Sequence, residues 1–171
     1  MPGENDHPPL LVSATTDLPR SGRLLGVDYG QKRLGLAICN DEQTIASPLQ
    51  NYTRHSDRLD GAHLQQIARE YRCVGCVVGL PLHMGGDVSV SSHRAQKFAA
   101  WLSSLTGLPI AYHDERCTSS VVEEQLILMD VSRSKRKEVL DKLAAQVILQ
   151  AYLDLRRPPT PPPLPLPIDE E

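Results

Sequence analysis

The sequence predicts an α/β domain built on a mixed five-stranded sheet with helices on both faces. Three apolar runs near residues 23–29, 34–39 and 45–52 come first, separated by short polar segments, which indicates antiparallel strands. Helical and strand-like patterns then alternate, as in βαβ units with parallel strands. The run 74–80 is almost entirely apolar or glycine, which is typical of a strand covered on both faces.

The spacing of apolar residues indicates where the helices lie. Leu64, Ile67 and Tyr71 recur at helical intervals, and Ser120 and Glu123 have the spacing of a capping box. The predicted elements after the first three strands are a helix over 57–71, the strand 74–80, a loop over 82–88, a helix over 90–105, a strand over 110–113, a helix over 119–129 and a helix over 134–156.

Length and composition predict one folded domain between two tails. The chain has 171 residues, 40% of them hydrophobic, and a formal net charge of −3. Residues 1–20 and 158–171 are rich in proline and polar residues and are expected to be disordered, which leaves a domain over 21–157. We find no apolar run of membrane-spanning length and no secretory signal pattern, so we expect a cytoplasmic protein without membrane contact.

The four cysteines are expected to pack in the core. Cys39, Cys73, Cys76 and Cys117 lie within or next to predicted strands, where a free thiol behaves as a small apolar side chain. The spacing of Cys73 and Cys76 is also found in redox and zinc motifs. However, no second Cys/His pair follows at a suitable distance, so a packing role is favoured.

Asp28 is the residue that most needs a chemical explanation. It ends an apolar run between Gly26 and Gly30, where a carboxylate is costly to hold without a cation or a hydrogen bond. A metal or phosphate site would supply that compensation, and the glycines would leave room for a ligand or a close backbone. An aspartate in a plain turn is the alternative, because short Gly-Asp-Gly patterns are common in turns.

Asp114 and Glu115 follow the predicted strand 110–113, and ligand sites in α/β sheets collect at strand ends. Successive strand residues face opposite sides, so we expect one of the two acids to face a site. The other would pair locally, with Arg116 as a candidate. The alternative is that both acids simply favour the N-terminus of the following helix.

Asp141 lies in the last predicted helix, at the margin of its apolar face near Ile148, where a carboxylate can look towards the sheet. A solvated aspartate is the alternative. Cations within 133–137 crowd the start of this helix, against its dipole; a bound polyanion or simple solvation would explain them. The predicted apolar face consists of Leu140, Leu143, Ala144, Val147, Ile148, Ala151 and Leu155.

Four ordered motifs across residues 23–156 resemble the YqgF (RuvX) family. They are Gly-Val-Asp-Tyr-Gly-Gln-Lys-Arg-Leu-Gly-Leu-Ala (26–37), Val-Val-Gly-Leu-Pro-Leu-His-Met-Gly-Gly (77–86), Asp-Glu-Arg-Cys-Thr-Ser (114–119) and Leu-Asp-Lys-Leu-Ala-Ala-Gln-Val-Ile-Leu-Gln-Ala-Tyr-Leu (140–153). This chain departs from the usual family pattern at His83, Gly85, Cys117 and Ser119, and the acidic positions are kept.

The resemblance implies an RNase H-like fold and nuclease activity. The family is similar to Holliday junction resolvases and is assigned to processing the 5′ end of precursor 16S ribosomal RNA in bacteria. It implies that Asp28 is the central catalytic and metal-binding carboxylate, completed by Glu115 (or Asp114) and Asp141. Such oxygens suit Mg²⁺ or Mn²⁺, and a two-metal site would catalyse phosphodiester hydrolysis.

The expected partner is therefore RNA, with Lys32, Arg33 and Arg116 near the strand ends as candidates for phosphate contacts. Phe98 and Trp101 lie on a predicted helix and are expected to pack in the core, so base-specific recognition is not indicated.

Three other functions remain open at this point. A structure-specific DNA nuclease such as a junction resolvase would act on branched DNA with the same carboxylates, as a two-fold homodimer. A sugar kinase or ATPase is suggested by the Gly-Val-Asp-Tyr-Gly turn, but these enzymes need two such domains around the nucleotide. A non-catalytic nucleic-acid-binding module would be marked by the loss of an acidic residue, and all three positions are filled.

Overall fold

The structure is a computed structural model that describes residues 17–81, 90–115, 130 and 132–158, apart from the side chains of residues 137–142. Its elements are β1 Leu24–Tyr29, β2 Arg33–Cys39, β3 Ala46–Thr53, α1 Asp57–Glu70, β4 Gly75–Leu80, α2 Val90–Thr106, β5 Ile110–Asp114 and α4 Arg133–Arg156. The corresponding predictions are confirmed to within about one residue at each end. The predicted loop over 82–88 and helix over 119–129 lie outside the described residues.

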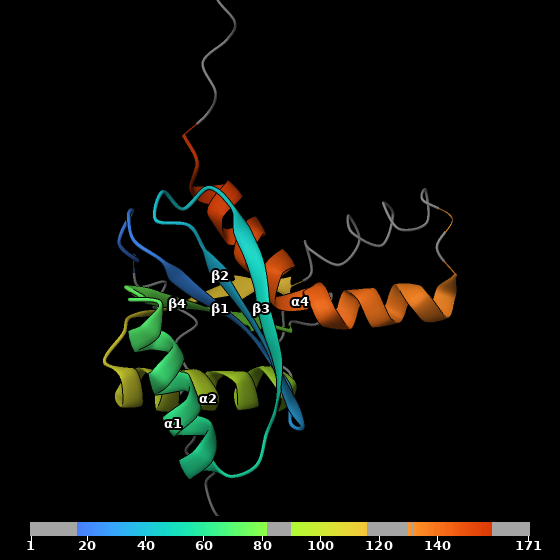
Figure 1. Ribbon diagram of the computed structural model, residues 1–171, viewed down its shortest axis with the longest axis horizontal. Coiled ribbons are helices and arrows are strands. Elements are labelled where there is room, and N and C mark those ends of the chain that lie inside the picture. The colour runs from blue at the N-terminus through green and yellow to red at the C-terminus, as the bar shows by residue number, and fades with distance from the viewer. Residues whose placement is uncertain (1–16, 82–89, 116–129, 131, 159–171) are drawn as a thin grey trace, which may run out of the picture.

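The five strands form one mixed sheet in the order β3-β2-β1-β4-β5. The pairs β1–β2 and β2–β3 are antiparallel, and the pairs β1–β4 and β4–β5 are parallel. Figure 1 shows α1 and α2 on one face of the sheet and α4 on the other, as predicted. Because β1, β4 and β5 run in the same direction, their carboxyl ends meet at one end of the sheet, where ligand sites form in such folds.

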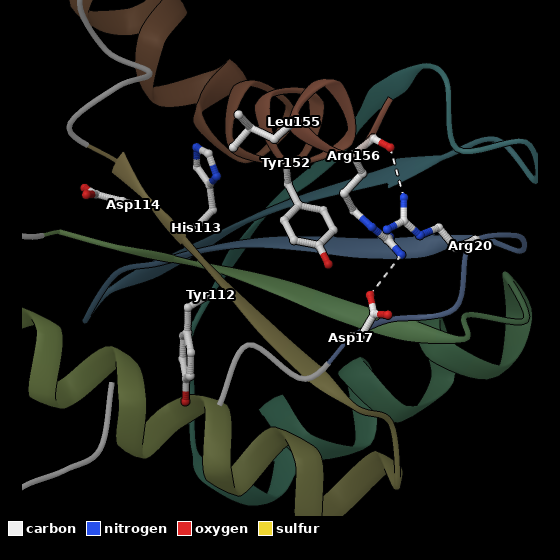
Figure 2. Close-up of a pocket in the computed structure, with 8 residues that line it drawn as sticks. All are labelled: Asp17, Arg20, Tyr112, His113, Asp114, Tyr152, Leu155 and Arg156. Atoms are coloured by element: carbon white, nitrogen blue, oxygen red, sulfur yellow. Dashed lines mark hydrogen bonds and ion pairs between the residues drawn. The ribbon is translucent and has the colours of Figure 1, made fainter. Parts of the chain in front are cut away.

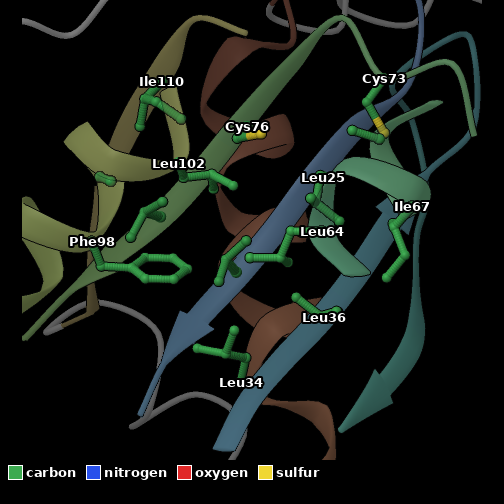
Figure 3. Close-up of a cluster of buried hydrophobic side chains, with 14 residues drawn as sticks. Leu25, Leu34, Leu36, Leu64, Ile67, Cys73, Cys76, Phe98, Leu102 and Ile110 are labelled. Atoms are coloured by element: carbon green, nitrogen blue, oxygen red, sulfur yellow. The ribbon is translucent and has the colours of Figure 1, made fainter. Parts of the chain in front are cut away.

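β1 divides its side chains between two cores. Leu25 and Val27 are fully buried between the sheet and the helices α1 and α2 (Figure 3). Leu24 belongs to the second core, beneath α4, and alternation along the strand puts Gly26 on that same face. A Cβ at Gly26 would lie 2.8 Å from the Cβ of Leu149, so glycine is what allows α4 to pack this closely on the sheet.

The buried side of α4 differs from the predicted one. Leu155, assigned to the apolar face, is 77% exposed. Apolar residues lie on most sides of this helix, so its pattern alone does not select a face. Polar contacts with β3 fix the orientation of α4. Gln150 Oε1 accepts from the Ala46 N–H at 2.8 Å, and Gln146 Nε2 donates to the Ala46 carbonyl at 3.0 Å. The buried residues of α4 are Ala145, Ile148, Leu149, Tyr152 and Leu153.

Residues 17–20, which the sequence analysis placed in the N-terminal tail, pack against the domain. Leu18 is 1% exposed within the core beneath α4. The guanidinium of Arg156 donates to the Leu18 carbonyl and forms an ion pair with Asp17 at 3.7 Å. Residues 1–16 and 159–171 lie outside the described part. None of the described helices is both long and apolar enough to cross a membrane.

Three of the cysteines are described, and all three are free and buried. Burial raises the pKa of Cys73 to about 12 and also raises that of Cys76. At neutral pH these thiols are therefore protonated, which suits the predicted packing role and not a redox or metal-binding one. Cys117 lies outside the described residues.

Candidate active site

Asp28 is the next-to-last residue of β1, is partly buried and faces α4. Gly35 lies opposite Asp28 in β2, and a Cβ built at Gly35 would lie 3.3 Å from the Asp28 Cβ and 3.4 Å from the Ala145 Cβ. The aspartate and α4 therefore sit over the same face of the sheet. Asp28 is a strand residue and not a turn residue. The turn begins at Gly30, where a Cβ would collide with the Arg33 carbonyl oxygen.

Glu115 follows the last residue of β5 and points under α4. A Cβ built at Gly79 of β4 would collide with Glu115 Oε1 and would lie 2.7 Å from the Cδ1 of Ile148. The Glu115 carboxylate thus lies directly over Gly79, between the sheet and α4. Glycine at position 79 creates the space that this carboxylate occupies.

The electrostatics of Glu115 place it beside Asp28. Burial is the largest cause that raises the pKa of Glu115 to about 7, and the negative charges of Asp28 and Asp114 raise it further towards that value. The negative charge of Asp28 close to a partly desolvated carboxylate makes this niche a candidate cation site. Residues from β1 and β5, far apart in the sequence, are brought together here.

Asp114 and Glu115 leave β5 on opposite sides, as expected from strand alternation. Figure 2 shows His113 directed towards α4 and Tyr112 directed towards α2, with Asp114 pointing away from His113 at the end of the strand. Glu115 shares the α4 face with Asp28, and Asp114 does not. Asp114, Tyr112 and His113 instead border a hollow of about 590 Å³ that runs along the edge strand β5.

His113 and Gly79 belong to the surroundings of the site, although the sequence analysis assigned neither a role. His113 is 5% exposed, and burial lowers its pKa while the charge of Asp114 opposes that effect. The imidazole is therefore neutral near pH 7. The period of two along β5, which puts His113 on the same face as Glu115, is the signal that could have identified it.

The structure describes only some of the remaining predicted site residues. Lys32 and Arg33 are exposed at the tip of the β1–β2 hairpin, close to the Asp28 end of β1. Position 141 lies in α4 one turn before Ala145, and its side chain is outside the described part. Arg116 also lies outside it. Among the residues whose side chains are described, no group of three acidic, histidine or cysteine side chains is gathered as a metal site.

The strand order of the mixed sheet defines an RNase H-like α/β domain. Asp28, near the end of the central strand β1, and Glu115, just after the edge strand β5, form its candidate carboxylate site. Residues 22–155 match the RuvX family, whose description is Holliday junction resolvase, and the chain belongs to this family.

Relatives of known name cover most of the chain. A protein of Bradyrhizobium diazoefficiens named "Putative pre-16S rRNA nuclease" is 43% identical over 144 residues, which make up 84% of this chain and 89% of the relative. A protein of Rhodopirellula baltica with the same name is 37% identical over 150 residues, covering 88% of this chain and 87% of the relative.

Solved structures with a similar arrangement include Holliday junction resolvases. RuvC of T. thermophilus in complex with a Holliday junction substrate has a TM-score of 0.49 and 14% identity, and the match covers 79% of this chain and 95% of that one. The yeast mitochondrial Holliday junction resolvase has a TM-score of 0.41 and 11% identity, covering 83% and 84%.

Proposed function

We propose that this protein is a metal-dependent nuclease that hydrolyses phosphodiester bonds during 5′-end maturation of precursor 16S rRNA in the cytoplasm. Family membership and the names of the relatives support a hydrolase that acts on nucleic acid. The single observation that carries the chemistry is the partly buried Glu115 carboxylate beside Asp28, over the space left by Gly79.

The acidic pair fits a divalent cation. Carboxylate oxygens are the ligands that Mg²⁺ and Mn²⁺ prefer, and the raised pKa of Glu115 reflects a repulsion that a cation would relieve. When bound, one or two such ions supply a nucleophilic water and stabilise the leaving oxygen. The described residues contribute two carboxylates, which leaves room for a third carboxylate ligand. We assign that role to Asp141, one turn before Ala145 in the helix that covers the pair.

The protein's own residues would prepare the site for this reaction. Asp28 and Glu115 hold the cation at the end of the sheet, and α4 covers them so that the local field is strong. Asp114, on the other side of β5, keeps a negative charge near Glu115 without entering the niche. Lys32, Arg33 and Arg116 are proposed to contact backbone phosphates of the substrate.

The second candidate is a structure-specific nuclease that acts on branched DNA, because the family description names Holliday junction resolvases. The same carboxylates would serve, and a two-fold homodimer would be needed to cut paired strands symmetrically.

One assay separates these functions. The purified full chain is offered precursor 16S rRNA and a synthetic four-way DNA junction, each with Mg²⁺ or Mn²⁺ and each with excess chelator. We expect metal-dependent cleavage of the RNA, and we expect Asp28→Asn to abolish it while the circular dichroism spectrum is retained. Preferential cleavage of the junction would support the resolvase function. Binding without cleavage of either substrate would identify a non-catalytic module and would refute the proposal.

A further inference from the structure

We propose that a second surface binds single-stranded nucleic acid that extends from the proposed active site. This surface, the α2 groove, is a hollow of about 290 Å³ at the same end of the sheet as Asp28 but on the opposite face. The proposal rests on the proposed nuclease function and names the form of nucleic acid that this part of the protein would hold. Its defining residues are the cations Arg54, Arg94 and Lys97 and the aromatic residues Tyr29, Phe98 and Trp101.

Aromatic rings form the floor of the α2 groove. The ring centroids of Tyr29 and Phe98 lie 5.0 Å apart, and those of Phe98 and Trp101 lie 5.6 Å apart. Phe98 is 5% exposed and packs in the core as predicted, whereas Tyr29 and Trp101 are only partly buried. Partly exposed aromatic rings beside cations are the feature with which proteins stack the bases of single strands, without regard to sequence.

The cations lie where they could meet phosphates. Arg94 and Lys97 are exposed and three residues apart on α2, so they are neighbours on one side of the helix. Among the described residues, neither has an acidic partner at ion-pair distance. A helix N-terminus attracts anions through its partial positive charge. The first turn of α2 contains no acidic residue that would repel an anion there.

Arg54 lines the groove, and its side chain is held in place by its neighbours. Its guanidinium bonds to the buried carboxylate of Asp60 at 3.1 Å and lies 5.5 Å from the centroid of the Tyr29 ring. The exposed acid that lines the groove, Asp57, is paired with Arg54 at 3.6 Å. Arg54, Asp57 and the buried Asp60 together carry a net charge of −1, so with Arg94 and Lys97 the groove keeps a net charge of +1.

Two adjoining hollows lead from the groove to the tip of the β1–β2 hairpin, near the Asp28 end of β1. A neighbouring hollow of about 470 Å³ shares Arg54 and Asp57 with the α2 groove and reaches Lys32 at the hairpin tip. Figure 1 shows this tip and the start of α2 at the same end of the molecule. Tyr29 directly follows Asp28, and the two side chains leave opposite faces of β1. A strand cut at Asp28 could therefore pass over the tip and enter the groove.

Charge complementarity favours a nucleic acid as the occupant over a second copy of this chain. A symmetric dimer through this face would bring Arg94 and Lys97 of both copies together, and like charges at an interface are costly. A polyanion with stacking bases satisfies both the cations and the exposed rings.

Trp101 is the only tryptophan in the chain, so its fluorescence reports on the groove directly. The test titrates a single-stranded RNA of about 12 nucleotides, within known single-strand site sizes, into the full chain carrying Asp28→Asn without divalent metal. Affinity is measured by anisotropy of the labelled RNA, over a range of salt concentrations. The groove variant adds Arg94→Ala and Lys97→Ala. The control variant adds Arg23→Ala and Arg69→Ala. These changes remove the same charge at the ends of β1 and α1 that lie away from the groove, just before β1 begins and in the last turn of α1.

We expect the RNA to quench Trp101 fluorescence and the groove variant to bind about tenfold or more weakly than the control variant. The slope of log affinity against log salt should fall by about 1.4 in the groove variant, from about 0.7 for each lost phosphate contact on a single strand. RNA binding without any change in Trp101 fluorescence, or equal affinities for the two variants, would overturn the groove while leaving the nuclease function intact. A Trp101 signal that changes with protein concentration alone would assign the groove to a second copy and would also overturn the proposal. Absence of metal-dependent cleavage by the chain without any substitution would instead refute the proposed function.

Discussion

Replacing Glu115 with glutamine should stabilise the metal-free protein at alkaline pH. In the folded protein the pKa of Glu115 is raised from 4.5 to about 7, first by burial and then by the charges of Asp28 and Asp114. Each pKa unit corresponds to about 1.4 kcal/mol. Ionised Glu115 therefore costs the folded state at most about 3.5 kcal/mol, and Glu115→Gln removes that cost while keeping the shape of the side chain.

The sign of the pH dependence follows from the two pKa values. The folded state holds the Glu115 proton more tightly than the unfolded state, so the free energy of unfolding falls as pH rises from about 4.5 to about 7. Below this window the carboxyl is neutral in both states, and wild type and Glu115→Gln should differ little. Above it, the variant should be more stable by up to the full amount, or by up to about 7–14 °C in Tm for a chain of this size.

Urea denaturation at pH 4.5 and pH 8, in the presence of a chelator, measures this difference. The matched control is Glu70→Gln, which makes the same chemical change at an exposed position at the end of α1. The control should show no pH-dependent gain. A Glu115→Gln variant that gains no more at pH 8 than at pH 4.5 would refute the placement of a desolvated carboxylate beside Asp28.

Four further substitutions test other parts of the structure. Gly79→Ala would place a methyl group against the Glu115 carboxylate. We expect urea titration to show about 1–3 kcal/mol of destabilisation, together with reduced metal-dependent cleavage. Full activity would contradict the placement of Glu115 over Gly79. Asp60→Asn removes the charge of a carboxylate that is 1% exposed and accepts hydrogen bonds from Tyr52, Arg54 and the His55 N–H. It should lower the free energy of unfolding by about 3–5 kcal/mol at pH 7. An unchanged Tm would argue against this network. Leu149→Ala should lower the free energy of unfolding by about 2–5 kcal/mol and Leu155→Ala by less than about 0.5 kcal/mol, because only Leu149 is buried. Equal losses would mean that α4 packs on the sheet through another face.

The fold could be predicted because its strands and helices carry strong local signals. The run 74–80 is apolar throughout, and the strand β4 that it forms is buried along its whole length. The hairpin between β1 and β2 follows from Gly30, where no side chain fits. The orientation of α4 could not be predicted in the same way, because it depends on Gln146, Gln150 and the space at Gly26, which are contacts between elements.

The sequence indicated Asp28 and the neighbours Asp114 and Glu115 as candidate site residues, but not the residues that surround them; the side chain of Asp141 lies outside the described part. Asp28 was identifiable as a costly charge at the end of an apolar strand, and strand alternation required Asp114 and Glu115 to separate. Which of the two faces α4 depends on the packing of Glu115 over Gly79, and nothing in the apolar run distinguishes Gly79 from Gly75 in this respect. Trp101 was assigned to the core because helical spacing cannot distinguish a buried ring from one at the rim of a groove.

Direct measurement of Mn²⁺ binding by electron paramagnetic resonance tests the central claim, that Asp28 and Glu115 together hold a divalent cation. The full chain, Asp28→Asn and Glu115→Gln are each titrated at pH 8, and circular dichroism confirms that each variant is folded. We predict that the wild-type chain binds Mn²⁺ and that each substitution weakens binding by about tenfold or more. Unchanged Mn²⁺ affinity in either folded variant would contradict the claim.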